Sequence, residues 1–413
     1  RYPRALGVGA AMLMIFGLVP GMPTAPFIVV SLLLAMGAVI SARVKQAHEE
    51  LDRETAAAAE AEKHAKPEER TEDYLVIDPL KIELGYGLIA MADPRQGGDL
   101  LSRIQIIRQQ MASKMGFVVP VIRIVDNMRM RPNEYRVLLR EAEIGRYELM
   151  PDHFLAMNPG IVEEEIGGFP TAEPAFGLKA TWVNRADRDR ADKLGYTIVE
   201  PSAVLATHLT ELLMAHADEL LTREDVQNLI NHTKEVAPTV VEELLPKVLN
   251  LGEIQKVLQG LLRERISIRN LQAILEVLAD YGPRTKDVEI LTEYSRHALA
   301  RQITEAYLDE EKILHVVTLA PELEQEILGA IKASEGGEYI PLSPERVDAM
   351  AQAAADAVQP LVLAGHDPIV LTSAQVRRYF RRIAERTLPK VVVLSYNEVD
   401  PAAKLQSEGQ VKG

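Results

Sequence analysis

The feature that most restricts this fold is a run without charged residues, from Ala5 to Ala42. One straight helix over that run would be about 57 Å long at about 1.5 Å per residue, nearly twice the apolar thickness of a bilayer, about 30 Å. The segment Pro20-Gly21-Met22-Pro23 interrupts the run, because proline and glycine stop a helix. The sequence therefore predicts a transmembrane hairpin over residues 1–43, with spans near Ala5–Val19 and Thr24–Ala42.

Basic residues flank the predicted hairpin at both ends, with Arg1 and Arg4 before it and Arg43 and Lys45 after it. Because cytoplasmic flanks carry an excess of Lys and Arg, both ends of the hairpin are expected on the cytoplasmic side of the membrane, with residues 44–413 in the cytoplasm. A signal peptide would lack the second span, and a buried core hairpin would carry a polar face, so both alternatives are disfavoured.

A charged linker is predicted over residues 44–78. Residues 43–73 hold ten acidic and six basic side chains and no aromatic one, so this stretch cannot bury a core. Two interpretations stay open: a tether that is helical in part, or a segment that docks on the cytoplasmic part or on a neighbouring subunit. The whole chain has a net charge of −14 and no cysteine, which disfavours nucleic acid as a partner and excludes disulfides and thiolate sites.

Two α/β units are expected next. In the first, a strand within 74–92 precedes the helix Asp99–Met115, which shows apolar residues at spacings of three and four and ends at Gly116. Strands Phe117–Val125 and Tyr135–Leu139 follow. The second unit holds strands Phe154–Met157, Leu178–Val183 and Tyr196–Val199 around a helix Ala186–Leu194, and Pro201–Leu221 is again helical.

An all-helical unit and a mixed α/β unit complete the predicted fold class. The helical unit begins at Thr222, where Asp225 makes a capping-box-like start, and contains the pair Leu251–Arg263 and Ile268–Tyr281. Acidic residues on the second of these helices disfavour DNA reading. The last unit alternates three strands, Ile313–Leu319, Pro368–Leu371 and Val391–Ser395, with helices near 321–332, 344–358 and 373–387.

An arginine stripe marks the helix 373–387, and two interpretations of it stay open. The stripe either binds an acidic partner or forms a solvated face opposite Val376, Phe380 and Ile383; its members are Arg377, Arg378, Arg381, Arg382 and Arg386.

Catalysis is not supported by any motif. The sequence contains no phosphate-binding glycine loop, no H-E-x-x-H and no nucleophile elbow. His208 and Glu211 would share a helix face with His216 two turns further on, but a third committed ligand is missing, so no metal and no cofactor are expected. The chain is predicted not to be an enzyme, with a membrane-tethered hydrolase as a disfavoured alternative.

Several stretches, in order and at matching spacing, resemble the export-gate family of bacterial type III secretion. They are "DPLKIELGYGLIAMAD" (78–93), "GDLLSRIQIIRQQMASKMGFVVPVIRIVDNM" (98–128), "PNEYRV" (132–137), "LAMNPG" (155–160), "EPAFGLKATWV" (173–183), "VLATHLTELL" (204–213) and "TLPKVVVLSYNEV" (387–399). The resemblance covers nearly the whole chain, with "GLVPGMP" in the family's last two spans. The "EPAFGL" loop favours the flagellar branch over the alternative, a virulence injectisome.

The resemblance implies a domain organisation. Its units are a first α/β subdomain at 79–151 with 201–220, an inserted second α/β subdomain at 152–200, a helical subdomain at 221–300, a C-terminal α/β subdomain at 301–400, and a tail at 401–413.

The resemblance also implies partners and a function. Members form a nine-subunit ring that docks chaperone–substrate complexes and passes the substrates to the membrane channel. The implied partners are other copies of the chain, flagellar export chaperones with their substrates, components of the export ATPase complex, and other membrane export-gate proteins.

A chaperone-binding dimple is implied between the first and second subdomains. The matching positions are Met157, Pro159, Glu173, Phe176, Leu178 and Thr207. Pro174 and Gly177 would fix the loop so that Phe176 offers apolar area, with Glu173 as a charged acceptor at the rim. The alternative is that Phe176 fills its own subdomain. The family often has aspartate at the Glu173 position, which leaves the rim geometry open. In the linker, Glu68, Glu69, Glu72 and Asp73 are expected to contact a basic surface of the adjoining subunit.

Overall fold

The computed structural model describes residues 77–413, except 161, 163, 335 and 336, and seven residues nearer the N-terminus. Those seven are helical, and each has 46–66% of its surface exposed: Met12, Ile15, Val29, Val30, Leu33, Met36 and Val39. Among the described residues, no helix has both the length and the apolar character to cross a membrane. The predicted hairpin and the linker through Val76 otherwise lie outside the described residues. The chain divides into two compact units, Arg1–Val76 and Ile77–Gly413, and the elements below belong to the second.

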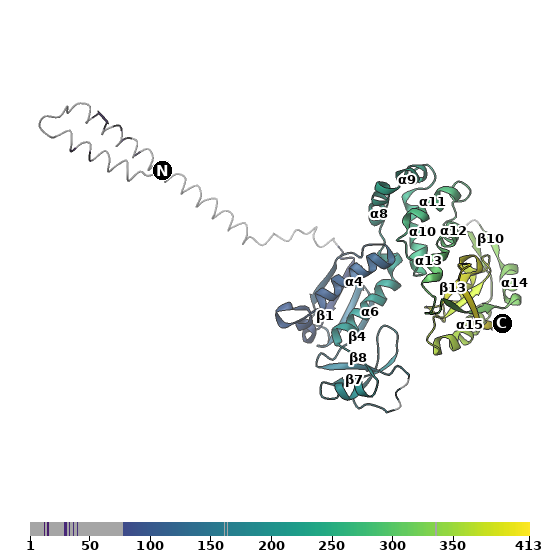
Figure 1. The fold of residues 1–413 in the computed structure, drawn as a ribbon, viewed down its shortest axis with the longest axis horizontal. Helices are drawn as coiled ribbons and strands as arrows, with labels where there is room; N and C mark the ends of the chain where they lie inside the picture. The colour runs from purple at the N-terminus through teal and green to yellow at the C-terminus, as the bar shows by residue number, and fades with distance from the viewer. Residues whose placement is uncertain are drawn as a thin grey trace. The chain divides into compact units, whose positions relative to one another are not determined.

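The first sheet has the strand order β2-β1-β3-β4 and is covered by two long helices, α4 and α6. Strand β1 pairs in parallel with β2 and antiparallel with β3, and β3 pairs antiparallel with β4. The helices lie side by side, and their apolar faces join the strands in the largest core of the described chain (Figure 1). The bounds are β1 Leu80–Leu84, β2 Ile122–Asp126, β3 Glu134–Leu139, β4 Ala142–Glu148, α4 Leu100–Met115 and α6 Pro201–Ala215.

The helix predicted over Asp99–Met115 is confirmed as α4, and Gly116 ends it at φ 84°, in the left-handed region that favours glycine. The strand predicted within 74–92 is β1, and in the described part of that range short helical turns follow it at η2 Tyr86–Leu88 and α3 Ile89–Ala92, with η3 Pro94–Gln96 next. The strand predicted over Phe117–Val125 starts only at Ile122, because Pro120 has no N–H for a ladder. Strand β4 was missed, since its exposed charges hide the alternation.

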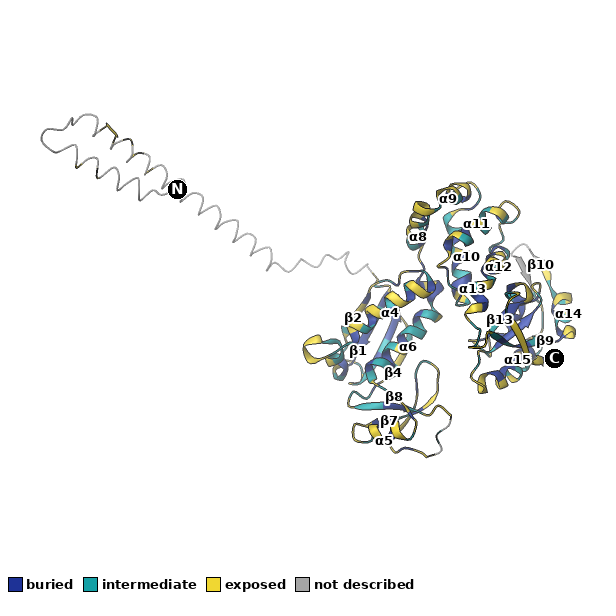
Figure 2. Cartoon of the chain, in the orientation of Figure 1, coloured by how far each residue is buried: buried dark blue, intermediate teal, exposed yellow. Residues whose placement is uncertain are grey.

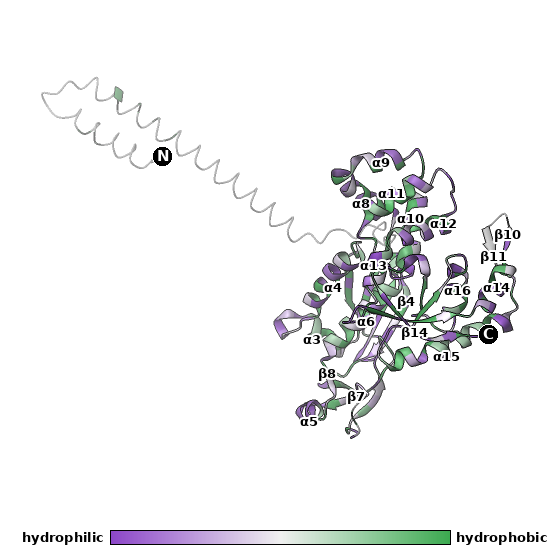
Figure 3. Ribbon diagram, turned by 45° about the vertical axis from the view of Figure 1, so that its right-hand side comes forward, coloured by the Kyte–Doolittle hydropathy of each residue, from purple (hydrophilic) through white to green (hydrophobic). Residues whose placement is uncertain are grey.

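The second sheet lies in sequence between β4 and α6, so the chain leaves the first sheet and returns to it. Its order is β6-β7-β5-β8. One face, with Leu155, Ala180 and Trp182, joins the main core, whereas Ala156 and Val183 form a small core with α5 on the other. Hydrophilic residues (purple) dominate α5 (Figure 3). The bounds are β5 His153–Met157, β6 Phe169–Ala172, β7 Lys179–Asn184, α5 Arg188–Lys193 and β8 Thr197–Val199.

The described residues from 217 to 305 form helices and no strand, and this interval includes the unit predicted to be all-helical over 221–300. The capping box at Thr222 and Asp225 is confirmed, and Asn250 with Glu253 makes a second one. Figure 2 shows the buried inner faces (dark blue) and exposed outer faces (yellow) of these helices. The bounds are α7 Ala217–Leu220, α8 Arg223–Val236, α9 Pro238–Leu244, α10 Leu251–Arg263, α11 Leu271–Tyr281, α12 Val288–Ala298 and α13 Ala300–Glu305.

The last sheet is parallel throughout, in the order β13-β12-β9-β14. The prediction of a tail over 401–413 is wrong. Lys404–Val411 is strand β14, which pairs with β9 and forms the edge of the sheet. Its side chains are exposed except for Val411, so no periodicity revealed it. The other bounds are β9 Ile313–Leu319, α14 Pro321–Ala330, β10 Lys332–Ser334, β11 Gly337–Tyr339, α15 Pro344–Leu363, β12 Ile369–Thr372, α16 Arg377–Ala384 and β13 Val392–Ser395. The predicted subdomain limits otherwise remain a prediction.

The arginine stripe pairs with acidic residues of the chain itself. Arg377 binds Glu293 on α12, and Arg378 and Arg382 both bind Glu289 there, while Arg381 pairs with Glu385 and Arg386 with Asp348. Val376, Phe380 and Ile383 are buried in the core of the last sheet, as the second interpretation predicts. Arg377 is buried in an ion cluster that joins the helical part to the last sheet. This ion cluster comprises Glu264, Glu293, Arg296, Arg377 and Glu398.

Candidate docking site

The loop 173–178 joins β6 to β7, and its own backbone and one carboxylate hold it in shape. Glu173 N–H donates to Leu178 O at 2.8 Å, and Gly177 N–H donates to Glu173 O at 2.9 Å. The Glu173 carboxylate accepts from the N–H of Ala175 at 2.9 Å and from that of Phe176 at 2.8 Å. Gly177 closes the turn at φ 70°, a conformation that costs other residues energy. The loop is therefore ordered independently of any partner.

This geometry corrects the role expected for Glu173. Only 4% of the residue is exposed, and both carboxylate oxygens bind the loop's own N–H groups. Glu173 is thus a positioning residue inside the loop rather than a charged acceptor at the rim. Phe176 and Leu178 remain exposed by 52% and 54%. The alternative that Phe176 fills its own subdomain does not fit this exposure.

Strand register brings Met157 and Leu178 to one end of the second sheet. Met157 pairs with Ala180 and Leu155 with Trp182, so these four side chains share one face. Leu178 is the last residue of the loop, two residues before Ala180, and therefore continues the row just before β7 begins. Leu155, Ala180 and Trp182 belong to the core that also includes residues of α6. The row therefore lies at the contact between the second sheet and α6, called the seam below, and its last member, Leu178, is exposed.

The other predicted positions lie on the elements that border this seam. Met157 is half-buried against the main core, and Pro159 is exposed just beyond the end of β5. The side-chain oxygen of Asn158 holds that turn by accepting from Gly160 N–H at 2.8 Å. Thr207 is exposed on α6. The structure thus places Met157, Leu178 and the loop at one end of the sheet. Among the described residues, no hydrogen bond or ion pair joins Thr207 to them.

Buried polar groups underlie the site. Tyr135 and His208 share a hydrogen bond of 2.7 Å between the hydroxyl and Nδ1. Burial lowers the pKa of His208 to about 4, so the imidazole is neutral at pH 7. Burial also raises the pKa of Tyr135 well above its ordinary value, and the nearby charges of Tyr147 and Glu173 add to this. Tyr135 and His208 thus form a buried hydrogen-bonded pair that joins β3 to α6.

The weak metal motif does not assemble. His208 binds Tyr135, Glu211 pairs with Arg265 at 3.1 Å, and His216 pairs with Glu219 at 2.7 Å. Across the part of the chain that the structure describes, no group of three or more His, Asp or Glu side chains could hold a metal ion.

Lys390 is a member of this site that sequence reasoning missed. It follows α16, yet its ammonium lies 4.2 Å from the centroid of the Phe176 ring. It also donates to Ala175 O at 3.3 Å and lies 3.8 Å from a Glu211 carboxylate oxygen. The two positions are 214 residues apart, and nothing in the pattern near "TLPKVV" indicates such a contact.

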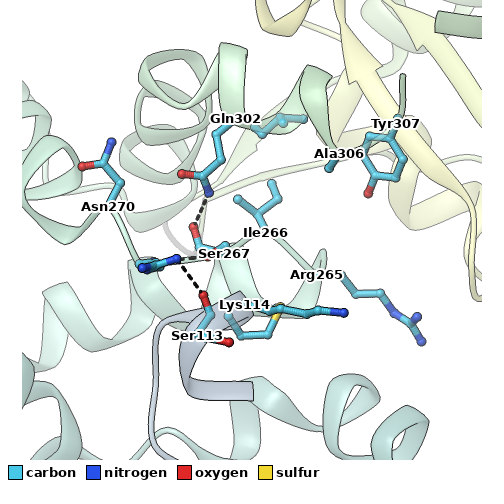
Figure 4. Close-up of a pocket in the computed structure, with 12 residues that line it drawn as sticks. Ser113, Lys114, Arg265, Ile266, Ser267, Asn270, Gln302, Ala306 and Tyr307 are labelled. Carbon is cyan, nitrogen blue, oxygen red and sulfur yellow. Dashed lines mark hydrogen bonds between the residues drawn. The ribbon is translucent and has the colours of Figure 1, made fainter. Parts of the chain in front are cut away.

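A pocket of about 600 Å³ lies beside the end of α4 (Figure 4). Its walls come from the end of α4, the segment after α10, and α13. Arg269 donates to Ser113 O at 3.1 Å and Gln302 to Ser267 O at 3.0 Å, which ties these walls together. None of the predicted docking residues lines it. The predicted linker contacts, Glu68, Glu69, Glu72 and Asp73, lie outside the described residues.

Comparison with known proteins relates the chain to one family of bacterial proteins. The sequence matches the FHIPEP family over residues 1–404. It is 43% identical over 413 residues to the flagellar biosynthesis protein FlhA of Bacillus subtilis, a match that covers 99% of this chain and 60% of that protein. The chain thus spans about three fifths of that relative's length.

Solved structures share the fold. The Chlamydia pneumoniae CdsV protein, solved alone and in complex with CdsO, is 26% identical, with a TM-score of 0.74 over 84% of this chain and 100% of that one. The nonameric cytosolic domain of EscV, from a type III secretion system, is 25% identical, with a TM-score of 0.66 over 82% of this chain and 97% of that one.

Proposed function

Because this chain belongs to the FHIPEP family, we propose that it is a component of the flagellar type III protein export gate, and that its 173–178 loop docks chaperone–substrate complexes. Similarity to a flagellar FlhA at 43% identity, against 26% for CdsV, supports the flagellar branch over an injectisome. In this proposal the chain forms a nine-subunit ring, which the nonameric EscV domain supports, and works with export ATPase components and other gate proteins.

The proposed location is the bacterial inner membrane, with residues 44–413 in the cytoplasm. The uncharged run from Ala5 to Ala42 supports two spans. The seven described residues of that run are helical with exposed apolar side chains, a surface that favours lipid or other membrane helices over water.

One observation carries the proposed docking site: a half-exposed aromatic ring on a loop that needs no partner for its shape. Preorganised loops lose little conformational entropy on binding, and aromatic anchors dominate interface energies. Phe176 and Leu178 supply the apolar area, and Met157 and Pro159 border it. Thr207 on α6 completes the proposed surface, and Glu173 contributes by holding the loop.

Titration of a purified flagellar chaperone–substrate complex against the full chain tests this proposal. Phe176→Ala is expected to weaken docking by about 2 kcal/mol, roughly 30-fold, as loss of an aromatic anchor does. Phe169→Ala is the matched control, because Phe169 lies on the same sheet and is 54% exposed. It should dock like the unchanged chain. Equal affinities for Phe176→Ala and Phe169→Ala would reject this surface.

A further inference from the structure

Lys390 covers the aromatic ring that the proposed function assigns to docking. Its ammonium lies 4.2 Å from the ring centroid of Phe176, within the range in which a cation is attracted to an aromatic face. The same nitrogen donates to Ala175 O at 3.3 Å. A partner that packs on this face of the ring must first displace the lysine.

A second anchor holds the ammonium beside the ring. Glu211, on α6, lies 3.8 Å from the Lys390 nitrogen, and only 17% of its side chain is exposed. Arg265 pairs with the same carboxylate oxygen at 3.1 Å. When a partner takes the ring, the ammonium can therefore keep an acidic neighbour, so displacement does not leave a charge without a counter-ion.

The contact links two parts of the chain, each of which has a core of its own besides residues in the main core. The 173–178 loop belongs to the second sheet, whose own core contains Val183 and Ala191. Lys390 lies between α16 and β13, in the part built around Phe380 and Val393. The side chain of Lys390 is 47% exposed, so water weakens its attractions. Contacts of this strength hold the Lys390 side chain beside Phe176, but a binding partner can displace it.

We propose that Lys390 is a removable cover over Phe176, which lowers docking affinity until an apolar partner surface displaces it. This inference rests on the proposed function, since it regulates the same surface. The cover also holds the 173–178 loop near the segment that carries Lys390, so docking separates the two.

The chain has no cysteine, which allows the contact to be measured directly. Spin labels on Arg185→Cys and Thr387→Cys, two exposed positions outside the contact, report the distance between the two parts in the full chain. Lys390→Met removes the charge at similar length, and Lys390→Arg keeps a cation. Lys247→Met removes an equal charge from an exposed position in the helical part. The same four chains are titrated with the chaperone–substrate complex.

The cover predicts that Lys390→Met broadens the label distances toward longer values and tightens docking about two- to fivefold, the scale of an exposed cation–aromatic contact. Lys390→Arg and Lys247→Met should match the unchanged chain in both measurements. The cover is overturned if the unchanged chain binds and Lys390→Met shows unchanged distances or no tighter docking. If the unchanged chain does not bind the complex at all, the proposed function fails, and the cover fails with it.

Discussion

Loss of Arg377 should open the junction between the helical part and the last sheet. The side chain is 2% exposed, and its guanidinium binds two carboxylates at once. It donates to Glu293 at 2.7 Å, to both Glu264 oxygens at 2.7 and 3.1 Å, and to Val393 O at 3.3 Å. Arg377→Met fills similar space but leaves Glu264 with Arg296 alone and Glu293 without its buried partner.

The size of the effect follows from Glu264. Burial alone would raise the pKa of this carboxyl, but Arg296 and Arg377 outweigh burial and bring the pKa down from 4.5 to about 2. That difference corresponds to about 3 kcal/mol of stability at neutral pH, supplied by all the arginines around Glu264 together. Breaking a buried ion pair by removing one partner costs about 3–5 kcal/mol, because it leaves a buried charge without compensation. We therefore expect Arg377→Met to lower the local free energy of unfolding by about 3–5 kcal/mol.

The sign of the pH dependence is set by the same shift. Because the folded-state pKa of Glu264 lies below its ordinary value, the stabilisation is complete above about pH 4.5 and is lost as the pH falls toward 2. Arg377→Met should move the pKa of Glu264 back toward its ordinary value. The variant is then less stable at pH 7 and less sensitive to acid within that window.

Hydrogen–deuterium exchange of amides in α12 and α16 is the appropriate assay, because a chain of several parts has no single free energy of unfolding. Arg382→Met is the matched control. That arginine binds Glu289 on the same pair of helices but is 48% exposed, so its loss should cost less than about 1 kcal/mol. If the two variants speed exchange equally, or if Arg377→Met leaves it unchanged, the ion cluster does not hold this junction.

Two further predictions concern the docking site and the linker. Glu173→Gln replaces one of the two acceptor oxygens with an NH2 group, which cannot accept, so the loop should loosen and docking should weaken by about 1.5 kcal/mol. Glu165→Gln is the exposed control, and unchanged docking of Glu173→Gln would show that the loop does not need Glu173. Deletion of residues 60–73 removes Glu68, Glu69, Glu72 and Asp73 and should weaken ring assembly, docking or both. Electron microscopy measures ring assembly and titration measures docking. If neither is altered, the linker is only a tether.

The sequence was sufficient to predict those helices and strands whose apolar side chains pack into a core. The spacing of Leu100, Ile104, Ile107, Met111 and Met115 predicted α4, because these side chains enter one core. Strand β9 was predicted at its observed bounds for the same reason. Strand β14 was missed because backbone pairing with β9, and not burial of its own side chains, makes it a strand. It lies at the edge of the sheet, and Val411 is its one buried residue.

Long-range charge pairing was the other limit. The row of arginines on α16 is visible in the sequence, but their partners on α12 lie about 90 residues earlier, and spacing within one helix does not identify them. Glu173 shows the same limit at short range. The sequence predicted that this loop matters and that Phe176 stays outside the core, yet only the structure shows the carboxylate bound to the N–H groups of its own loop.

The ion cluster and the docking site are connected through one short segment. Arg377 and Arg296 both donate to Val393 O at 3.3 Å, and Val393 lies three residues after Lys390. The ion cluster thus fixes the backbone segment next to Lys390, from which the Lys390 side chain reaches Phe176. The base of the cover is held by charges that are nearly fully buried, whereas its tip is held by contacts open to water. Because the tip is the weaker of the two, a docking partner should displace the lysine side chain without disturbing the junction beneath it.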